Sequence, residues 1–205
     1  MTHVALMHNP DAGNKNHKRA ELMTLLRDAA SKPRYQSTNG NYDQALARPG
    51  DFIIAAGGDD TVRKIAKHLV GSGTPLAILP LGTANNIPKS LGIAGETRDL
   101  IAGLASARVK KFDVGVAKGP WGKKYFFEGF GMGFFTDVMV RLGGREKKQA
   151  RGPERASDPL ELALHALQRT LAGYGASDIQ MTLDDKDVSG RFLLFEALNI
   201  KLAGP

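Results

Sequence analysis

The chain has 205 residues, 42% of them hydrophobic and 7% aromatic, so it can bury a core and is not disordered as a whole. It contains no cysteine, which excludes disulfides, thiolate metal sites and cysteine nucleophiles. Its 28 Lys and Arg outnumber its 21 Asp and Glu, and the net charge of +7 favours anionic partners such as nucleotides, nucleic acids or acidic lipid surfaces.

The first half of the chain alternates apolar runs with helical patterns. Residues 3–8, 51–56 and 75–80 read as buried strands, and helices are expected over 17–30, from 61 onward and from 97 onward. Strands separated by helices indicate βαβ units and a parallel sheet. We therefore predict an α/β domain over residues 1–111, a Rossmann-like parallel sheet with helices on both faces.

The second half changes pattern after about residue 111. We predict a mainly antiparallel domain over 112–205, with strands at residues 112–117, 124–130, 178–183 and 191–200. A mobile charged insert is expected near 143–158. An amphipathic helix follows the insert, with one face formed by Leu160, Leu164, Leu167 and Leu171. The sequence stops just after a strong strand. We therefore expect an incomplete β-sandwich, from a fragment or from a chain whose partner, such as a second copy in a homodimer, covers that edge.

No signal peptide or membrane-spanning segment is expected. The N-terminus lacks a basic region followed by a long apolar stretch, and no apolar run approaches the roughly 20 residues that span a bilayer. We expect a soluble, cytoplasmic protein.

One loop with phosphate-binding character follows the strand at 51–56. It reads Gly57-Gly58-Asp59-Asp60-Thr61 and opens a helix. Glycines let the backbone approach a ligand, and a helix N-terminus presents free N–H groups to phosphate. Asp59 would brace the loop or hold Mg²⁺ through water, and Thr61 offers a hydroxyl. A tight turn with Asp60 or Thr61 as helix cap is the competing interpretation.

A second loop repeats this arrangement after the strand at 75–80. Gly82 and Thr83 lie just past the strand, and Asn85 and Asn86 precede a short helix. Ligands of open α/β sheets bind at the carboxyl ends of the strands. Two such loops at one edge predict a shared anion site, although asparagine at a helix start is often a cap.

Together the two loops resemble the diacylglycerol kinase catalytic-domain family, which includes bacterial lipid kinases and sphingosine kinases. The resemblance rests on residues 57–61 and on Leu79-Pro80-Leu81-Gly82-Thr83-Ala84-Asn85-Asn86. Asn9-Pro10 with Gly13 resembles the family's first turn, and Thr38 stands where members place a nucleotide-contacting threonine. The likeness covers about residues 4–135.

The resemblance implies a kinase that transfers the γ-phosphoryl of ATP to a lipid hydroxyl, with Mg²⁺ as cofactor. It also implies peripheral contact with the inner face of a membrane. The residues expected to bind the nucleotide are Asn9, Thr38, Gly57, Gly58, Asp59, Asp60, Thr61, Gly82, Thr83 and Asn85.

The chain departs from the family pattern in three ways. Asp60 replaces the usual glycine, and Asn86 stands where many members have aspartate. The family's catalytic and Mg²⁺-organising acids lie late in the second domain, and this sequence ends before any matching segment. No catalytic base and no metal ligand is assigned.

Two other functions compete with the lipid kinase. NAD kinases resemble the family in the first glycine loop, but residues 79–86 favour the lipid branch. A nucleotide- or lipid-binding module without catalysis is the non-enzymatic alternative. No aromatic-basic motif indicates nucleic-acid binding. The basic residues of 143–158 are either a solvated loop or a contact with anionic lipid.

Overall fold

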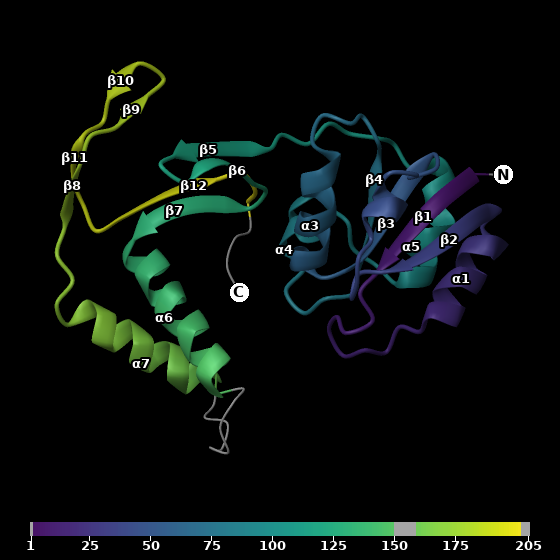
Figure 1. Ribbon diagram of the computed structural model, residues 1–205, viewed down its shortest axis with the longest axis horizontal. Coiled ribbons are helices and arrows are strands. Elements are labelled where there is room, and N and C mark those ends of the chain that lie inside the picture. The colour runs from purple at the N-terminus through teal and green to yellow at the C-terminus, as the bar shows by residue number, and fades with distance from the viewer. Residues whose placement is uncertain (1, 150–158, 202–205) are drawn as a thin grey trace. The chain divides into compact units, whose positions relative to one another are not determined.

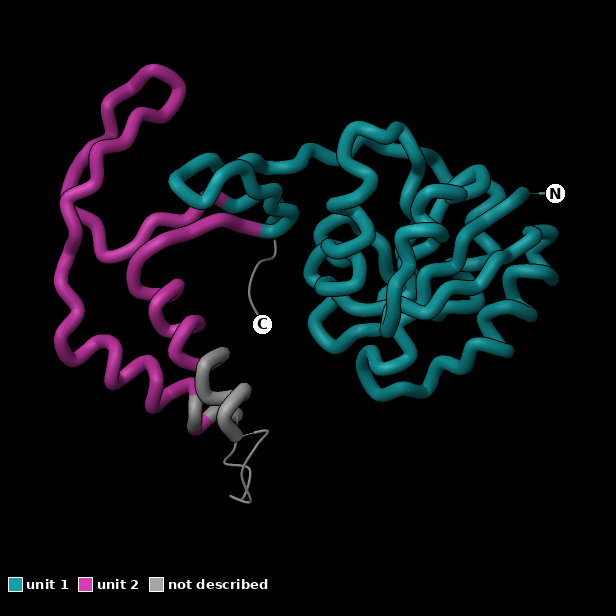
Figure 2. The backbone as a smooth tube through the Cα atoms, viewed as in Figure 1, with its two compact units in different colours: residues 1–128, 198–205 teal, residues 129–197 magenta. Residues whose placement is uncertain are grey.

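The computed structural model describes residues 2–149 and 159–201. Two compact units divide the chain: residues 1–128 with 198–205, and residues 129–197 (Figure 2). Each unit is described by itself. The domain boundary predicted between residues 111 and 112 stays a prediction.

A parallel sheet forms the centre of the first unit (Figure 1). Its strands are β1 (Thr2–His8), β2 (Ser31–Ser37), β3 (Phe52–Gly57) and β4 (Leu76–Pro80). They lie in the order β2-β1-β3-β4, and all neighbouring pairs are parallel. Strands buried on both faces read as continuous apolar runs, as β1, β3 and β4 do. The predicted α/β fold class is confirmed.

Helices cover both faces of this sheet, as predicted. Helices α1 (Arg19–Asp28) and α5 (Thr97–Ala102) pack on the face that carries Val4 and Leu6. Helices α2 (Asp43–Leu46), α3 (Asp59–Leu69) and α4 (Asn86–Ser90) pack on the face that carries Ala5 and Met7. The short helix η1 (Gly103–Ser106) follows α5. Alternate residues of one strand thus enter two separate cores.

Strand β2 is the main element that the sequence analysis did not assign. Its sequence, SKPRYQS, is polar and contains Pro33. It forms one edge of the sheet, where a strand can be polar and where proline is tolerated. Hydrophobic patterning is weak in such a strand, and only its pairing with β1 defines it.

A β-hairpin ends the first unit's main segment. Strands β5 (Gly115–Gly119) and β6 (Gly122–Phe126) pair antiparallel, and Trp121 lies in the turn between them. Beyond the hairpin, Phe127 and Ile200 join the core on the Ala5 side of the sheet. The predicted strand over 124–130 is corrected to two strands, because β6 ends at Phe126 and the next strand begins at Gly129.

The second unit combines short strands with two helices. Its elements are β7 (Gly129–Gly133), α6 (Phe134–Gln149), α7 (Pro159–Leu171), β8 (Ser177–Ile179), β9 (Thr182–Leu183), β10 (Lys186–Asp187), β11 (Gly190–Phe192) and β12 (Leu194–Leu198). The pairs β8–β11 and β9–β10 are antiparallel, and β7 pairs with β12. Residues 143–149, predicted in a mobile insert, belong to α6, and 150–158 lie outside the described residues.

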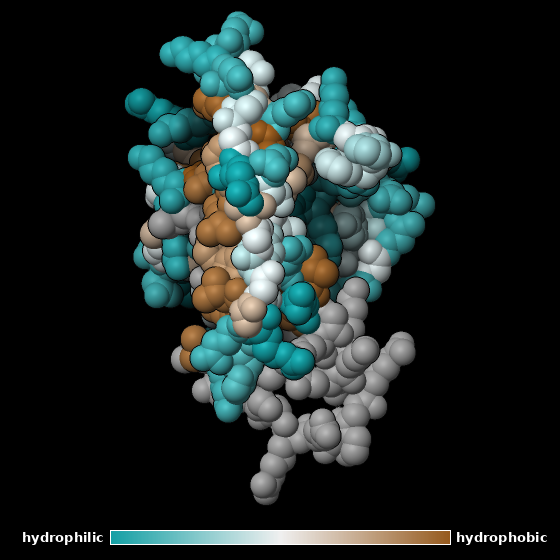
Figure 3. Space-filling model, turned by 90° about the vertical axis from the view of Figure 1, so that its left-hand side faces the viewer, coloured by the Kyte–Doolittle hydropathy of each residue, from teal (hydrophilic) through white to brown (hydrophobic). Residues whose placement is uncertain are grey.

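The leucine face predicted for α7 is not its buried face. Among the described side chains of α7, Ala166 and Thr170 are buried, whereas Leu164 and Leu171 are 51% and 66% exposed. The helices α6 and α7 contact each other. Figure 3 shows hydrophobic residues exposed among hydrophilic ones on the side of the molecule that carries this unit. Among the helices that the structure describes, none has the length and apolar character required to cross a membrane.

Candidate functional site

The four parallel strands end at one edge of the sheet, and each is followed by a loop. Backbone hydrogen bonds continue the pairing of the strands into these loops. The Asn9 amide donates to the Ala56 carbonyl at 2.9 Å, and the Leu81 amide donates to the Gly57 carbonyl at 3.0 Å. Thr38 directly follows β2 at the same edge. The loops therefore start from fixed positions, and their polar residues meet where α/β sheets bind ligands.

The two glycine loops pack against each other through their backbones. A Cβ built on Gly82 would lie 2.4 Å from the Gly58 Cα, and one built on Gly58 would lie 3.2 Å from the Gly82 Cα. A Cβ on Gly57 would overlap the Thr61 side chain at 2.5 Å. The sequence analysis attributed these glycines to close approach of a ligand. Their packing in the structure already requires glycine at positions 57 and 82.

Asp59 joins the first loop to the second. Its Oδ2 and Oδ1 atoms accept hydrogen bonds from the amides of Asn86 and Ile87, each at 2.9 Å. These amides open α4, so the carboxylate satisfies two N–H groups that have no partner within that helix. The predicted bracing role of Asp59 is confirmed in this form. The helix cap of α3 is Gly58, not Asp60 or Thr61.

Asn85 stabilises the second loop from within. Its Oδ1 accepts from the Gly82 amide at 3.0 Å, and its Nδ2 donates to the Gly82 carbonyl at 2.7 Å and to the Pro80 carbonyl at 3.2 Å. The residue has φ 52° and ψ 46°, in the left-handed region that asparagine tolerates. Its side chain is therefore committed to the loop, while the neighbouring Thr83 is exposed.

A chain of hydrogen bonds holds the turn that follows β1. The Ala12 carbonyl can only accept, so His17 Nε2 donates to it at 2.8 Å. In the neutral pair, His17 Nδ1 then accepts from His8 Nε2 at 2.8 Å, and His8 Nδ1 accepts from the Tyr35 hydroxyl at 3.2 Å. His8 is 1% exposed. Burial, together with the nearby His17, lowers the pKa of His8 to about 4.

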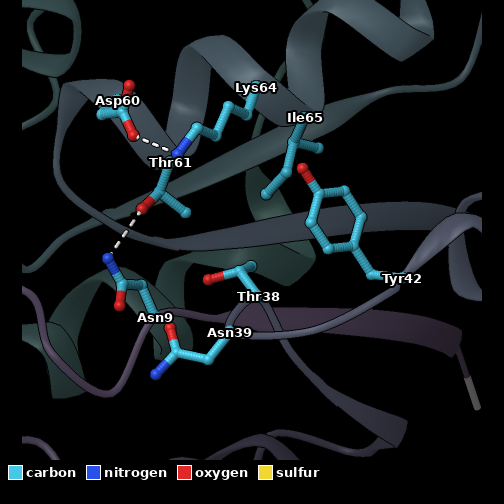
Figure 4. Close-up of a pocket in the computed structure, with 8 residues that line it drawn as sticks. All are labelled: Asn9, Thr38, Asn39, Tyr42, Asp60, Thr61, Lys64 and Ile65. Atoms are coloured by element: carbon cyan, nitrogen blue, oxygen red, sulfur yellow. Dashed lines mark hydrogen bonds and ion pairs between the residues drawn. The ribbon is translucent and has the colours of Figure 1, made fainter.

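A pocket open to solvent lies between the first turn, the start of α3 and the segment after β2 (Figure 4). It contains about 310 Å³ of empty space. Asn9 donates from Nδ2 to the Thr61 hydroxyl at 3.2 Å, and Thr61 is only 4% exposed. The lining residues are Asn9, Thr38, Asn39, Tyr42, Asp60, Thr61, Lys64 and Ile65.

Charged side chains cluster beside the pocket. Asp60 pairs with Arg63 at 2.7 Å and with Lys64 at 2.5 Å, and Arg63 also reaches Glu128 at 3.3 Å. Partial burial raises the pKa of Asp60, but hydrogen bonds from Lys64 and Arg63 outweigh it and leave that pKa lowered. Burial and then the nearby Asp59 raise the pKa of Glu128, against the opposing effect of Arg63.

The structure brings together part of the predicted nucleotide-binding set. Asn9, Thr38, Asp60 and Thr61 line the pocket. Five other predicted residues do not line it and belong to the packed loops beside it: Gly57, Gly58, Gly82, Thr83 and Asn85. The sixth, Asp59, holds α4.

Sequence reasoning missed three polar lining residues. Lys64 was not among the predicted site residues, although its position four residues after Asp60 is the spacing of a helical ion pair. Asn39 and Tyr42 follow β2, and because that strand was not assigned, neither could be placed at the edge.

The described residues do not fit a dedicated Mg²⁺ site. No group of three His, Asp or Glu side chains within 2–149 and 159–201 could hold a metal ion. Amides occupy both oxygens of Asp59, and cations pair with Asp60 and Glu128. We therefore assign no metal ligand and derive no catalytic step through a metal.

Comparison with known proteins identifies the family of this chain. The family model described as the diacylglycerol kinase catalytic domain matches residues 3–117. The chain belongs to the diacylglycerol kinase catalytic-domain family, and the resemblance inferred from the sequence is confirmed.

Individual relatives agree with this assignment. A protein named "Probable lipid kinase YegS-like" from Pseudomonas aeruginosa is 32% identical over 157 residues, which cover 73% of this chain and 50% of that protein. A diacylglycerol kinase from Bacillus subtilis is 27% identical over 210 residues, covering 95% of this chain and 64% of that protein. The crystal structure of a diacylglycerol kinase from Bacillus anthracis has the same fold, with a TM-score of 0.66, 20% identity and coverage of 99% and 65%. The chain thus spans between half and two thirds of the length of these relatives.

Proposed function

We propose that this chain binds ATP at the loop edge of its parallel sheet and forms the nucleotide-binding part of an ATP-dependent lipid kinase. One observation carries the proposal: two glycine loops, joined backbone to backbone, stand beside a polar pocket at the strand ends. The chain's membership of the diacylglycerol kinase family supports phosphoryl transfer as the activity.

The proposed nucleotide site uses the predicted residues in two ways. Asn9, Thr38 and Thr61 line the pocket and would contact the nucleotide directly, with Lys64 as a cation for phosphate, and Asp60 lines the pocket as the ion-pair partner of Lys64. The loops that contain Gly58 and Gly82 would present backbone amides, and α3 adds the positive end of its dipole. Asp59 and Asn85 would hold these loops in position, and their own side chains would not contact the ligand.

The proposed reaction is transfer of the γ-phosphoryl of ATP to a lipid hydroxyl. The acceptor oxygen forms a bond to the γ-phosphorus, the bond from that phosphorus to the bridging oxygen breaks, and ADP leaves. The hydroxyl proton passes to a base that we do not assign. The described residues would contribute the positioning of the nucleotide.

The lipid side of the function is proposed on the family alone. Residues 1–111 would bind the nucleotide, and residues 112–205 would contribute to lipid binding. The acceptor would be diacylglycerol, the substrate class in the name of the Bacillus subtilis relative. The protein would then act in the cytoplasm, peripherally at the inner face of the membrane.

Nucleotide titration tests the proposal. We expect ATP to bind, and Thr38→Val to weaken it by about fivefold, because the change removes a lining hydroxyl at nearly constant shape. The matched control is Thr24→Val, since Thr24 is exposed on α1, outside the pocket lining. Isothermal calorimetry measures both variants. Absence of ATP binding to the unmodified chain would contradict the proposed function, and equal affinities of the two variants would remove Thr38 from the site.

A further inference from the structure

The charge balance of the pocket is unusual for an anion site. Of the eight lining residues in the described part of the chain, Asp60 and Lys64 carry the formal charges, and they pair with each other at 2.5 Å. The remaining polar lining consists of hydroxyl and amide groups. The ion pair therefore leaves the pocket without net charge, although nucleotide phosphates would require positive charge there.

Asp60 occupies a position suited to an anion. It lies in the first turn of α3, an 11-residue helix whose N-terminus favours negative charge. Two cations, Arg63 and Lys64, reach its two carboxylate oxygens. These contacts lower the pKa of Asp60 despite its partial burial, so the group is ionised at neutral pH.

The Asp60–Lys64 contact is also easily displaced. The side chains are 58% and 61% exposed, and ion pairs in water contribute little stability. A polyphosphate carries several charges and can replace a single carboxylate. Arg63 would keep Glu128 as a partner at 3.3 Å after Asp60 is displaced.

We propose that Asp60 is an internal competitor for the phosphate site: its carboxylate holds Lys64 in the position that a phosphate group of the ligand takes. Binding of a nucleotide polyphosphate then requires exchange of the Asp60–Lys64 ion pair for a phosphate–Lys64 pair. Asp60 thereby lowers affinity for the polyphosphate portion of the ligand and leaves the nucleoside portion unaffected. The inference rests on the proposed function only for the identity of the ligand, because the competition applies to any polyphosphate.

The test compares ATP, tripolyphosphate and adenosine, without metal, by calorimetry on the whole chain. We expect Asp60→Asn to bind ATP and tripolyphosphate about tenfold more tightly, since it removes a charge adjacent to the phosphates. Adenosine affinity stays unchanged. Asp60→Gly should behave in the same way. Asp28→Asn is the matched control, because it makes the same change of charge at an exposed position at the end of α1.

A second comparison assigns the gain to Lys64. Lys64→Gln should reduce tripolyphosphate affinity several-fold more in the Asp60→Asn background than in the unmodified chain, where the lysine is already paired. Equal reductions in both backgrounds would overturn the exchange of partners.

The possible outcomes separate this inference from the proposed function. Equal or weaker binding of both polyphosphates to Asp60→Asn would overturn the inference, and weaker binding would give Asp60 a positive role in binding. If ATP binds equally to both chains, the function stands and the inference fails. If Asp60→Asn gains affinity for tripolyphosphate but neither chain binds ATP, the inference stands and the proposed function fails.

Discussion

Acidification should destabilise the protein through His8, which ends β1 beneath the loop edge. The side chain is 1% exposed and lies between the Tyr35 hydroxyl and His17, with the Arg19 guanidinium 4.3 Å from the Tyr35 ring centroid. Its pKa is lowered from 6.5 to about 4. The unfolded chain therefore binds a proton more readily than the folded chain does between these two pH values.

The size of the effect follows from that pKa difference. Both states are neutral at His8 above about pH 7, so the full stability is present there. As the pH falls, the unfolded state gains the proton first, and the free energy of unfolding drops by about 2 kcal/mol at pH 5. The loss reaches about 3 kcal/mol once the pH passes below the folded-state pKa.

Urea denaturation at pH 7, 6 and 5 measures this loss. The His8→Gln variant should be less stable at pH 7, because it disturbs the hydrogen-bond chain, but it should lose about 2 kcal/mol less than the unmodified chain on going to pH 5. His3→Gln is the control, since His3 is exposed and its replacement should preserve the full dependence. Identical pH dependence in His8→Gln and the unmodified chain would refute the reasoning.

Two substitutions test how the loops are held, both by urea denaturation and ATP titration. Gly82→Ala should lower the free energy of unfolding by about 1–3 kcal/mol and weaken ATP binding, because its Cβ would lie 2.4 Å from the Gly58 Cα. The control is Gly103→Ala, which should be nearly neutral because the added Cβ would meet open space. Asp59→Asn should lose about 1–3 kcal/mol, because one of the two amides at the start of α4 then faces an NH₂ group, and Asp28→Asn should lose little. Unchanged stability in either loop variant would show that its contact is not needed for folding.

The sequence by itself determined the α/β architecture and the positions of its chemistry. Residues 3–8, 51–56 and 75–80 are apolar runs because strands covered by helices on both faces must be apolar throughout. Parallel strands end at one edge, so the loops after residues 57 and 80 could be placed together before any contact was known.

Pairing with a neighbour was needed to define the edge of the sheet and the pocket. Strand β2 is polar, and only its parallel pairing with β1 defines it as a strand. Its assignment brings Asn39 and Tyr42 to the pocket. Periodicity reports burial along one segment, and an edge strand with little burial leaves no such pattern.

Only the tertiary structure decided what the loop residues contact. Gly82 requires glycine because its backbone packs against that of Gly58, and Asp59 accepts hydrogen bonds from the first amides of a helix that begins at Asn86. The Arg63–Glu128 pair likewise joins residues far apart in the sequence. These contacts depend on β3 lying next to β4 and on the position of the segment that contains Glu128. Hydrophobic patterning within a single segment encodes neither of these arrangements.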